Sequence, residues 1–222
     1  MTMTRRRQLL LVCLSMALSF AVLLCLTAIA SVPGPSWWIN RGVVNTNAPQ
    51  NDYAAVTQGQ VKNMATQAAA ELATNLPGGA GSSVLALVSG FSSANDYLPA
   101  NNGQLKSVAK PFYDRLISVG YTNAYPWAGA VMTNDYAIAN GGELKSLFAW
   151  DIAKDSIGDG IPDWWRAHYF GGSGTTTNNI SCASCDANGN GVSNLTEFNA
   201  GSNPVTPIFT VTYPANGTTI YP

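Results

Sequence analysis

Charged residues and histidine are scarce in this sequence. Its 222 residues include 11 Lys+Arg, 12 Asp+Glu and a single His. Proteins that bind nucleic acids need a basic patch, so this balance argues against a nucleic-acid partner. The single histidine, His168, lies beside aromatic residues, and Asp114 and Glu143 stand alone on the surfaces of expected helices. Because no nucleophile, base or pair of carboxylates is set up for catalysis, we expect a protein that is not an enzyme.

Cysteine is also rare, and its placement limits the metal chemistry. Cys13 and Cys25 fall in the apolar N-terminal stretch, whereas Cys182 and Cys185 form a C-x-x-C pair. A zinc site needs four ligands, which one histidine and this pair do not supply. In an oxidising compartment the pair is expected to form a short disulfide.

The first 30 residues have the composition of an export signal. Three arginines at positions 5–7 precede a nearly unbroken apolar run over 9–30, which ends in Ala-Ile-Ala at Ala30. This pattern is typical of a secretory signal peptide, and it predicts cleavage after Ala30 and a secreted or cell-surface protein. The run is also long enough to cross a bilayer, so an uncleaved anchor is the alternative, and contact with a membrane is expected only there.

An internal repeat occupies the middle of the chain. Asn51, Asn95 and Asn134 each begin an Asn-Asp-Tyr motif, and eight residues after each asparagine a Gly-Gln/Glu-x-Lys motif follows. Apolar residues then recur at helical spacing, as at Leu105, Val108, Phe112 and Leu116. We therefore expect three helical repeat units that stack on their neighbours to bury an apolar face, with a further short helix over 82–91.

The repeated motif has two interpretations. In one, its Asn-Asp-Tyr and Gln-x-Lys residues form a ligand or glycan surface that is repeated three times. In the other, Asn and Asp hold a turn, Tyr packs between units, and Gln and Lys face solvent. Because repeats that stack must keep their turn and packing residues, we expect the second.

The acid excess of the chain lies beyond residue 154 and has an informative spacing. Residues 155–222 hold five acids and one base. Within them, residues 186–197 match the twelve-residue EF-hand-type loop, in which oxygen ligands at positions 1, 3, 5, 7, 9 and 12 surround Ca²⁺ and a glycine at position 6 permits the turn. The ligand positions are Asp186, Asn188, Asn190, Val192 through its carbonyl, Asn194 and Glu197. Because only two are charged, we expect weak calcium binding.

Residues 155–166 follow the same frame less completely. The candidate ligands are Asp155, Asp159, Ile161 through its carbonyl, and Asp163. Position 3 is Ile157 and position 12 is Arg166, so two ligands are missing. The loop either binds calcium with Asp163 ligating directly or serves as a degenerate structural partner of the second loop. For both loops the alternative to a calcium site is an ordinary polar turn, which Asp and Gly also favour.

The run Asp-Gly-Ile-Pro-Asp-Trp-Trp at 159–165, followed by the loop at 186–197, resembles the paired calcium loops of bacterial exported proteins. These are described as thrombospondin type 3-like or dockerin-like. The resemblance implies calcium chelation that stiffens a linker or a cell-surface stalk, and in dockerins the paired helices also bind a cohesin. The Asn-Asp-Tyr repeats resemble units found ahead of such loops in large exported bacterial proteins.

The expected organisation is mainly α-helical. A signal peptide (1–30) and a linker (31–50) precede the three-copy helical repeat domain (51–154), the tandem calcium-loop segment (155–204), and a linker or the first strands of a truncated immunoglobulin-like β-sandwich domain (205–222). The expected function is that of a calcium-stabilised structural module of a larger exported protein. The alternatives are a dockerin-like adaptor with a cohesin-like protein partner, and a carbohydrate-binding module for a cell-surface glycan, attached to a catalytic domain that lies elsewhere.

Overall fold

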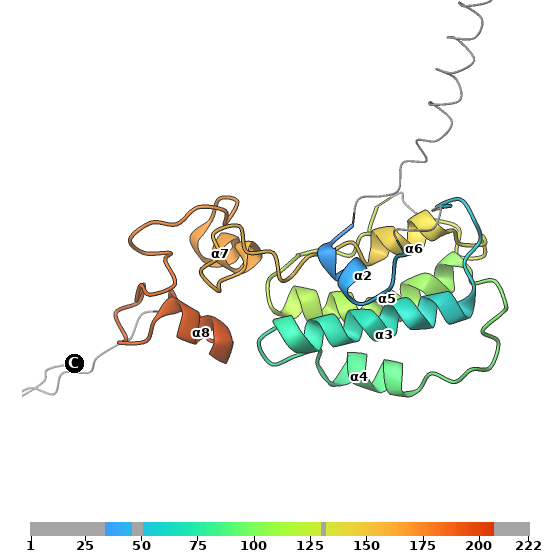
Figure 1. Ribbon diagram of the computed structural model, residues 1–222, viewed down its shortest axis with the longest axis horizontal. Helices are drawn as coiled ribbons and strands as arrows, with labels where there is room; N and C mark the ends of the chain where they lie inside the picture. Colours follow the sequence, from blue (N-terminus) through green and yellow to red (C-terminus); the bar gives the residue numbers. More distant parts are fainter. Residues whose placement is uncertain (1–33, 46–50, 130–131, 207–222) are drawn as a thin grey trace, which may run out of the picture.

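The computed structural model describes residues 34–45, 51–129 and 132–206. The chain is mainly helical there, and the described residues contain isolated β-bridges but no β-sheet. The helices are α2 (Ser36–Asn40), α3 (Gln58–Asn75), α4 (Ser82–Ser89), α5 (Asn102–Ser118), α6 (Gly141–Leu147), α7 (Asp163–Phe170) and α8 (Asn194–Ala200). Helices α2 to α6 form one lobe, and α7 and α8 lie in a smaller lobe at its end (Figure 1).

The three repeats each begin a helix in the same way. Thr57, Asn101 and Asn140 are the N-caps of α3, α5 and α6, and each accepts a hydrogen bond from the amide of the Gln or Glu three residues later. That Gln or Glu side chain in turn accepts from the N-cap amide, so all three helices start with a reciprocal capping box. The repeated Gln/Glu therefore has a local structural role, contrary to the expectation that it simply faces solvent.

The repeats close into a ring rather than stacking in a row. The amide of Val56 donates to the carbonyl of Ala139, Ala139 donates to Ala100, and Ala100 donates back to Val56. A β-bridge joins each pair of repeats: Ala55 with Asn140, Thr57 with Pro99, and Asn101 with Ile138. This pseudo-threefold arrangement corrects the expectation of an open stack, because each unit contacts both of the others and no repeat is terminal.

Ion pairs follow the same cyclic order. Lys62 contacts Asp96, Lys106 contacts Asp135 and Lys145 contacts Asp52, with N–O distances of 2.6, 2.5 and 2.5 Å. Each motif lysine thus binds the motif aspartate of another repeat. The motif glycine is required because a Cβ at Gly59 would lie 3.0 Å from the Cβ of Asp96, where the turn of the next repeat packs.

The motif tyrosines do not pack between units, which corrects a second expectation. Tyr53, Tyr97 and Tyr136 are 89%, 95% and 90% exposed. The space between repeats is filled by the bridge residues and by aliphatic side chains of the helices, such as Leu105 and Leu144, which leaves no room there for a phenol ring.

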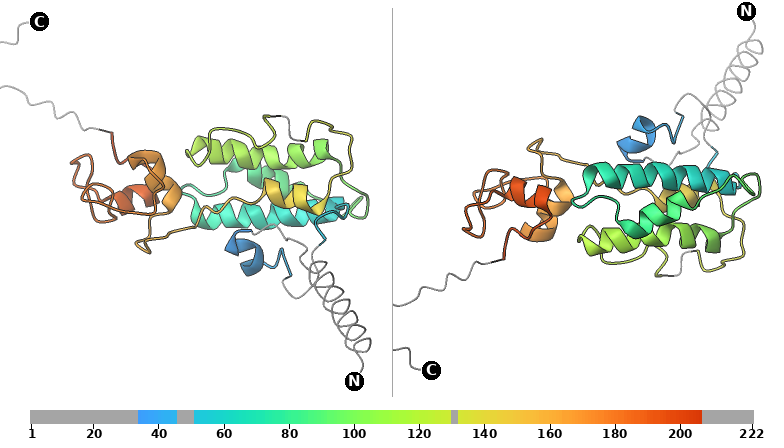
Figure 2. Two further views of the ribbon diagram at one scale, coloured as in Figure 1. Left: turned by 90° about the horizontal axis from the view of Figure 1, so that it is seen from above. Right: turned by 90° about the horizontal axis from the view of Figure 1, so that it is seen from below.

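The segment expected to be a linker contains part of the core. Helix α2 buries Trp37 and Trp38 against the large hydrophobic cluster. Their indole N–H groups donate to the carbonyls of Trp150 and Phe148, and the Trp37 ring stacks on Trp150 at 5.2 Å. Since five residues are too few to display helical periodicity, this element had no sequence signal beyond the tryptophan pair itself. Figure 2 shows α2 against one side of the repeat helices.

The small lobe attaches to the large one through aromatic contacts. Trp164 of α7 donates from its indole to the carbonyl of Ile152 and meets Tyr121 edge-on at 5.9 Å. A second small core of Ile161, Trp165 and Phe198 holds α7 against α8. The expected Cys182–Cys185 disulfide is formed. The signal peptide and the β-strands expected after residue 206 lie outside the described residues, and no helix within the described ranges is long and apolar enough to cross a membrane.

Candidate metal centre

The second loop gathers most of its expected ligands around one hollow. Asn188, Asn190, Val192 and Glu197 line a cavity of about 330 Å³, together with Ser202, Asn203 and Thr206. The carboxylate of Asp186 accepts from the amides of Asn190 and Gly191 at 3.0 and 2.7 Å, which curls the loop toward it. Gly191 has a φ of +81°, which a glycine at the sixth position adopts without strain.

Glu197 is the most informative residue of this loop. Its side chain is buried, with 2% of the residue exposed. One carboxylate oxygen, Oε1, accepts from the side-chain amides of Asn188 and Asn190 at 3.1 Å each. The other, Oε2, is buried and has no hydrogen-bond partner among the described residues. A buried carboxylate oxygen without a donor is costly, and a cation beside it would remove that cost.

Asn194, expected as the ligand at position 9, uses its side-chain nitrogen for contacts outside the loop, whereas its Oδ1 is buried and has no hydrogen-bond partner among the described residues. Its side-chain amide donates to the carbonyls of Ile180 and Cys182 at 2.7 and 2.8 Å. Its backbone amide donates to Cys185, and that of Leu195 donates to Ala183. The disulfide turn is therefore hydrogen-bonded to the first residues of α8. Asn194 can make this contact because it lies in the first turn of the helix, after the Ser193 N-cap.

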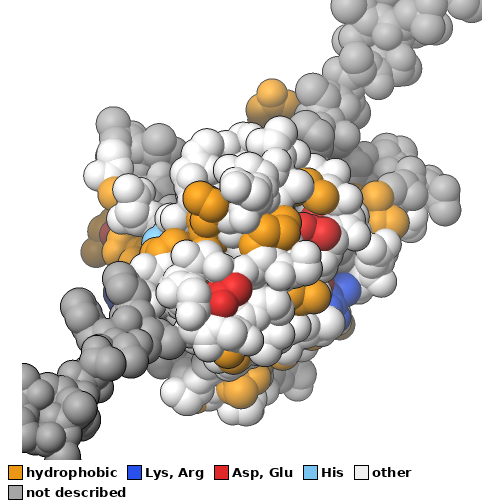
Figure 3. Space-filling view, turned by 90° about the vertical axis from the view of Figure 1, so that its left-hand side faces the viewer, with side chains coloured by type: hydrophobic (Ala, Val, Ile, Leu, Met, Phe, Trp, Pro, Cys, Tyr) orange, Lys and Arg blue, Asp and Glu red, His pale blue; other side chains and the backbone are white. Residues whose placement is uncertain are grey.

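The donor set of this hollow suits a hard, oxygen-seeking cation. It is lined by carboxamide and carboxylate groups, whose oxygens Ca²⁺ accepts in flexible geometry. The NH2 groups of Asn188 and Asn190 donate to Glu197, and their Oδ1 atoms accept from the backbone amides of Asn190 and Val192. Among the described residues no three His, Cys, Asp or Glu side chains come together, because this loop takes its remaining oxygens from asparagines and the backbone. In Figure 3, which faces the small lobe, acidic side chains are few and separate on a largely uncharged surface.

The first loop satisfies its carboxylates with groups from the protein. Asp155 accepts from the amides of Ile157, Gly158 and Gly160. Asp163 accepts from the amide and the hydroxyl of Ser156 at 2.9 and 2.6 Å. Asp159 accepts from the amide of Ile161 and from Arg166. The predicted ligands are thus near one another, and each expected carboxylate already has donors.

Arg166 was not among the predicted functional residues, yet it organises this loop. It stands at position 12, where a calcium loop has Glu, and it is 1% exposed. Its guanidinium donates to Asp159 at 2.6 Å and to the carbonyls of Ser181 and Gly174 at 3.2 and 2.9 Å. The guanidinium of Arg166 therefore places a fixed positive charge beside the carboxylates that a Ca²⁺ ion would contact in an EF-hand-type loop. The signal that could have revealed this role was the departure of position 12 from the pattern.

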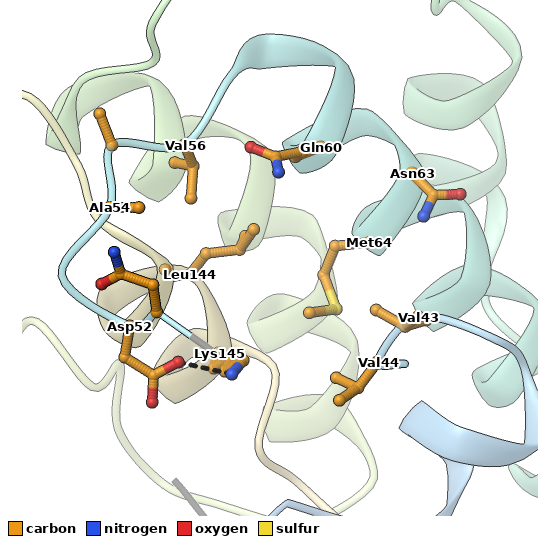
Figure 4. Close-up of a pocket in the computed structure, with 13 residues that line it drawn as sticks. Val43, Val44, Asp52, Ala54, Val56, Gln60, Asn63, Met64, Leu144 and Lys145 are labelled. Carbon is orange, nitrogen blue, oxygen red and sulfur yellow. Dashed lines mark hydrogen bonds and ion pairs between the residues drawn. The ribbon is translucent and has the colours of Figure 1, made fainter. Parts of the chain in front are cut away.

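Two further hollows in the described residues follow the seams between repeats. One of about 250 Å³ lies between α3 and α6, with Val43 and Val44 at its rim and the Asp52–Lys145 pair at one end (Figure 4). A smaller hollow of about 190 Å³ occupies the equivalent place between α3 and α5, with Phe91 at its rim. Because the equivalent positions of the ring line both, they arise from the repeat packing.

The helices that leave the two loops carry aromatic residues that a docking surface could use. Trp165 and Phe198 are buried against each other at 5.7 Å between ring centroids. Trp164 is partly buried against the repeat lobe. His168 is exposed and meets only Tyr169 among the described aromatic rings, at 4.6 Å. Trp164, Trp165 and Phe198 therefore pack against other residues of this chain.

Comparison of the chain with protein-family models, with curated proteins and with solved structures finds no match.

Proposed function

We propose that this protein is an exported calcium-binding structural module, in which the loop at 186–197 binds one Ca²⁺ and stiffens the small lobe. The observation that carries the proposal is the buried Glu197 carboxylate: its Oε1 accepts from Asn188 and Asn190, whereas its Oε2 has no donor among the described residues. In an EF-hand-type loop the acid at position 12 ligates through both oxygens. A Ca²⁺ ion in the adjoining hollow would use this carboxylate as a bidentate ligand.

The remaining ligands come from the same loop. Asp186, Asn188 and Asn190 supply side-chain oxygens, and Val192 supplies its carbonyl. The side-chain nitrogen of Asn194 holds α8 against the disulfide turn, and its Oδ1, which has no partner among the described residues, is left for position 9, either directly or through a water. With two charged ligands, the dissociation constant is expected in the range of about 10⁻⁴ to 10⁻³ M that is common for extracellular modules.

The mechanical consequence of binding follows from the surrounding chain. Residues 171–193 contain no helix, and turns and short-range hydrogen bonds hold them. A cation bound to residues from both ends of the 186–197 loop would fix α8 relative to this segment, because binding to the folded loop stabilises it over its open forms. The module would then act as a rigid spacer between the repeat lobe and whatever follows residue 206.

The first loop is proposed as a structural partner without calcium. Arg166 supplies the positive charge that the carboxylates of this loop need, and it does so at every calcium concentration. The dockerin-like alternative depends on exposed aromatic anchors, and the burial of Trp165 and Phe198 weighs against it.

The test is calorimetric titration of calcium into the chain after removal of divalent ions, with tryptophan fluorescence in parallel. Trp164 and Trp165 contact Phe198 of α8 at 6.4 and 5.7 Å, so they report on the position of that helix. We expect a stoichiometry of one. Glu197→Gln keeps the volume and the acceptor for the asparagine amides, so it should lower the affinity at least about tenfold while the fold is retained.

A matched pair of variants assigns the site. Asp186→Asn and Asp155→Asn change the same position of the two loops. The first should weaken calcium binding, and the second should leave it unchanged. If neither variant alters the heat of binding, or if the unmodified chain binds no calcium at millimolar concentration, the proposal fails.

A further inference from the structure

The motif tyrosines are the one repeated feature for which the fold provides no use. Every other repeated position has a structural task in the ring: Asn and Asp form the turn and the ion pair, Gly permits close approach, Gln or Glu caps the helix, and Lys binds an Asp. Tyr53, Tyr97 and Tyr136 remain about nine-tenths exposed. Among the described residues none of the three rings makes an aromatic or cation–π contact or a hydrogen bond through its hydroxyl.

Retention of these tyrosines therefore needs another explanation. The second residue after each tyrosine differs in all three copies, as Ala55, Pro99 and Ile138, and the first differs in one, as Ala54, Leu98 and Ala137. A large exposed apolar ring at the same place in all three copies contributes nothing to the core. One exposed ring alone would be ordinary for a protein surface, but here an exposed tyrosine recurs at the equivalent place in all three repeats.

The ring closure places the three tyrosines at equivalent positions around one end of the repeat lobe. Each turn that carries a tyrosine is hydrogen-bonded to the first turn of a repeat helix: Asp52 to Gly142, Asp96 to Gly59, and Asp135 to Gly103. Helices α3, α5 and α6 all start at this end. The opposite ends of α3 and α5 meet the small lobe, where Asn75 and Gly120 approach residues 155–168 (Figure 1). The tyrosine end is thus free of the candidate calcium centre.

The chemistry around the tyrosines favours a neutral ligand with apolar and hydroxyl faces. The aspartate before each ring is paired with a lysine, so the formal charges of each turn cancel. Carboxamide side chains are close in sequence, with Asn51, Asn95 and Asn134 exposed in the same turns. A nucleic acid would need unpaired cations. A hydrophobic peptide would need a continuous apolar groove, whereas these rings stand on three separate turns.

From these observations we infer that Tyr53, Tyr97 and Tyr136 are three equivalent aromatic subsites for a neutral polysaccharide. The C–H face of a sugar ring stacks on a tyrosine, and its hydroxyl groups reach the neighbouring amides. One subsite alone binds weakly, but a polymer that reaches two or three of them gains affinity through effective concentration. The inference does not depend on calcium, because the subsites lie on the repeat lobe.

The test is retention of the full chain, expressed with its own leader, on insoluble cellulose, chitin and β-1,3-glucan, in EGTA and in calcium. We expect retention on at least one of the three in both buffers, and release by soluble oligosaccharides of the same polymer. Each single Tyr→Ala change should weaken binding about 3- to 10-fold. The triple variant should weaken it about 100-fold or more, because avidity is lost with the subsites.

Controls separate this inference from general effects. The triple Tyr→Phe variant keeps the stacking face and should retain most of the binding, whereas Ile180→Ala changes a half-exposed apolar residue of the small lobe and should change nothing. The tyrosine variants should unfold at the temperature of the parent, since these side chains are about nine-tenths exposed. The inference is overturned if no polysaccharide retains the chain, if the triple alanine variant binds as well as the parent, or if the chain binds only anionic pectin or anionic lipid vesicles. Failure here would leave the calcium titration unaffected.

Discussion

At the residue scale, the two loops of the small lobe differ in what surrounds their carboxylates. Each crowds carboxylate and amide oxygens into a tight turn. The first loop balances them with the guanidinium of Arg166, which is buried and hydrogen-bonded to Asp159. The second has no cationic side chain close to Glu197, and one oxygen of that carboxylate has no donor within the described part of the chain. The two loops therefore differ at their twelfth position, where the first has a cationic Arg166 and the second an acidic Glu197; on the proposed function, a Ca²⁺ ion would supply the missing charge in the second.

This contrast leads to a prediction for Arg166→Glu. The change restores the acid that the loop frame expects at position 12 and removes the fixed cation beside Asp159. Calcium stoichiometry by calorimetry should rise from one to two, and the variant should become less stable than the parent in EGTA by about 3–5 kcal/mol, because a buried pair loses one partner.

Arg166→Gln serves as the control for loss of the guanidinium alone. It should be destabilised to a similar degree in EGTA but gain no second site. A second site in the glutamine variant would mean that the arginine blocks calcium rather than replaces it, and an unchanged stoichiometry in the glutamate variant would contradict the prediction.

Tyr113 gives a second prediction at this scale, for alkaline pH. Its hydroxyl donates to the carbonyl of Leu147 in the core. Burial is the main cause that raises the pKa of Tyr113 from 10.0 to about 12, and the nearby Tyr121 adds to it. Above pH 10 the unfolded chain loses this proton while the folded chain keeps it, so the free energy of unfolding should fall as pH rises from 10 to 12, by up to roughly 3 kcal/mol.

Urea unfolding at pH 9, 10 and 11 would measure this loss. Tyr113→Phe should be less stable at pH 9, since it loses the hydrogen bond, but its stability should decline less between pH 9 and 11. An equal decline in both proteins would assign the effect to other groups.

At the scale of elements, a short turn supplements the packing of α7 on α8 in the small lobe. The turn of Cys182 and Cys185 offers its carbonyls to Asn194 and Leu195, while Ser181 accepts from Arg166. This turn therefore lies between the first loop and the helix that carries Glu197. The disulfide limits the conformations of the turn, which would preorganise the proposed calcium site.

We predict that Cys182→Ser combined with Cys185→Ser weakens calcium binding about 3- to 10-fold without changing the stoichiometry, because part of the binding energy must then order the turn. Calorimetry on the double variant and on the parent treated with a thiol reductant should agree. If both bind calcium as tightly as the oxidised parent, the turn does not contribute to the site.

At the scale of the whole molecule, the ring ties together residues that are far apart in the chain. The Lys62–Asp96 and Lys106–Asp135 pairs span 34 and 29 residues, whereas Lys145–Asp52 spans 93 and closes the circle. The closing pair is also the most enclosed, with side chains 11% and 10% exposed, against 18% and 58% for Lys106 and Asp135. Its loss should therefore affect the lobe more than loss of another pair.

We expect Lys145→Ala to lower the free energy of unfolding by about 2–4 kcal/mol, because a largely buried carboxylate is left without its cation. Lys106→Ala, at the equivalent position of the ring, should cost about 1 kcal/mol or less because Asp135 remains hydrated. Urea denaturation followed by circular dichroism would measure both. Equal costs for the two variants would indicate that closure of the ring contributes no extra stability.

Much of the local structure could be predicted from the sequence. The repeat, the capped helix starts, the buried stripes of α3 and α5 and the C-x-x-C disulfide depend on residues a few positions apart, whose interactions are the same in any fold that keeps them. The common twelve-residue frame of the two loops at 155–166 and 186–197 is likewise a matter of spacing. For this reason Asn188, Asn190, Val192 and Glu197 lie around one hollow as expected.

Only the tertiary structure decided the rest, because those features depend on partners distant in sequence. Ring closure, the Lys–Asp order and the exposure of the motif tyrosines follow from contacts between repeats. The incorporation of α2 depends on carbonyls more than 100 residues away. The guanidinium of Arg166 and the side-chain nitrogen of Asn194 donate to carbonyls of residues 180–182, at or beside the disulfide turn. Sequence spacing thus determined which polar side chains each loop and repeat contains. Three-dimensional packing determined which of them already have hydrogen-bond or ion-pair partners within the described chain and which do not.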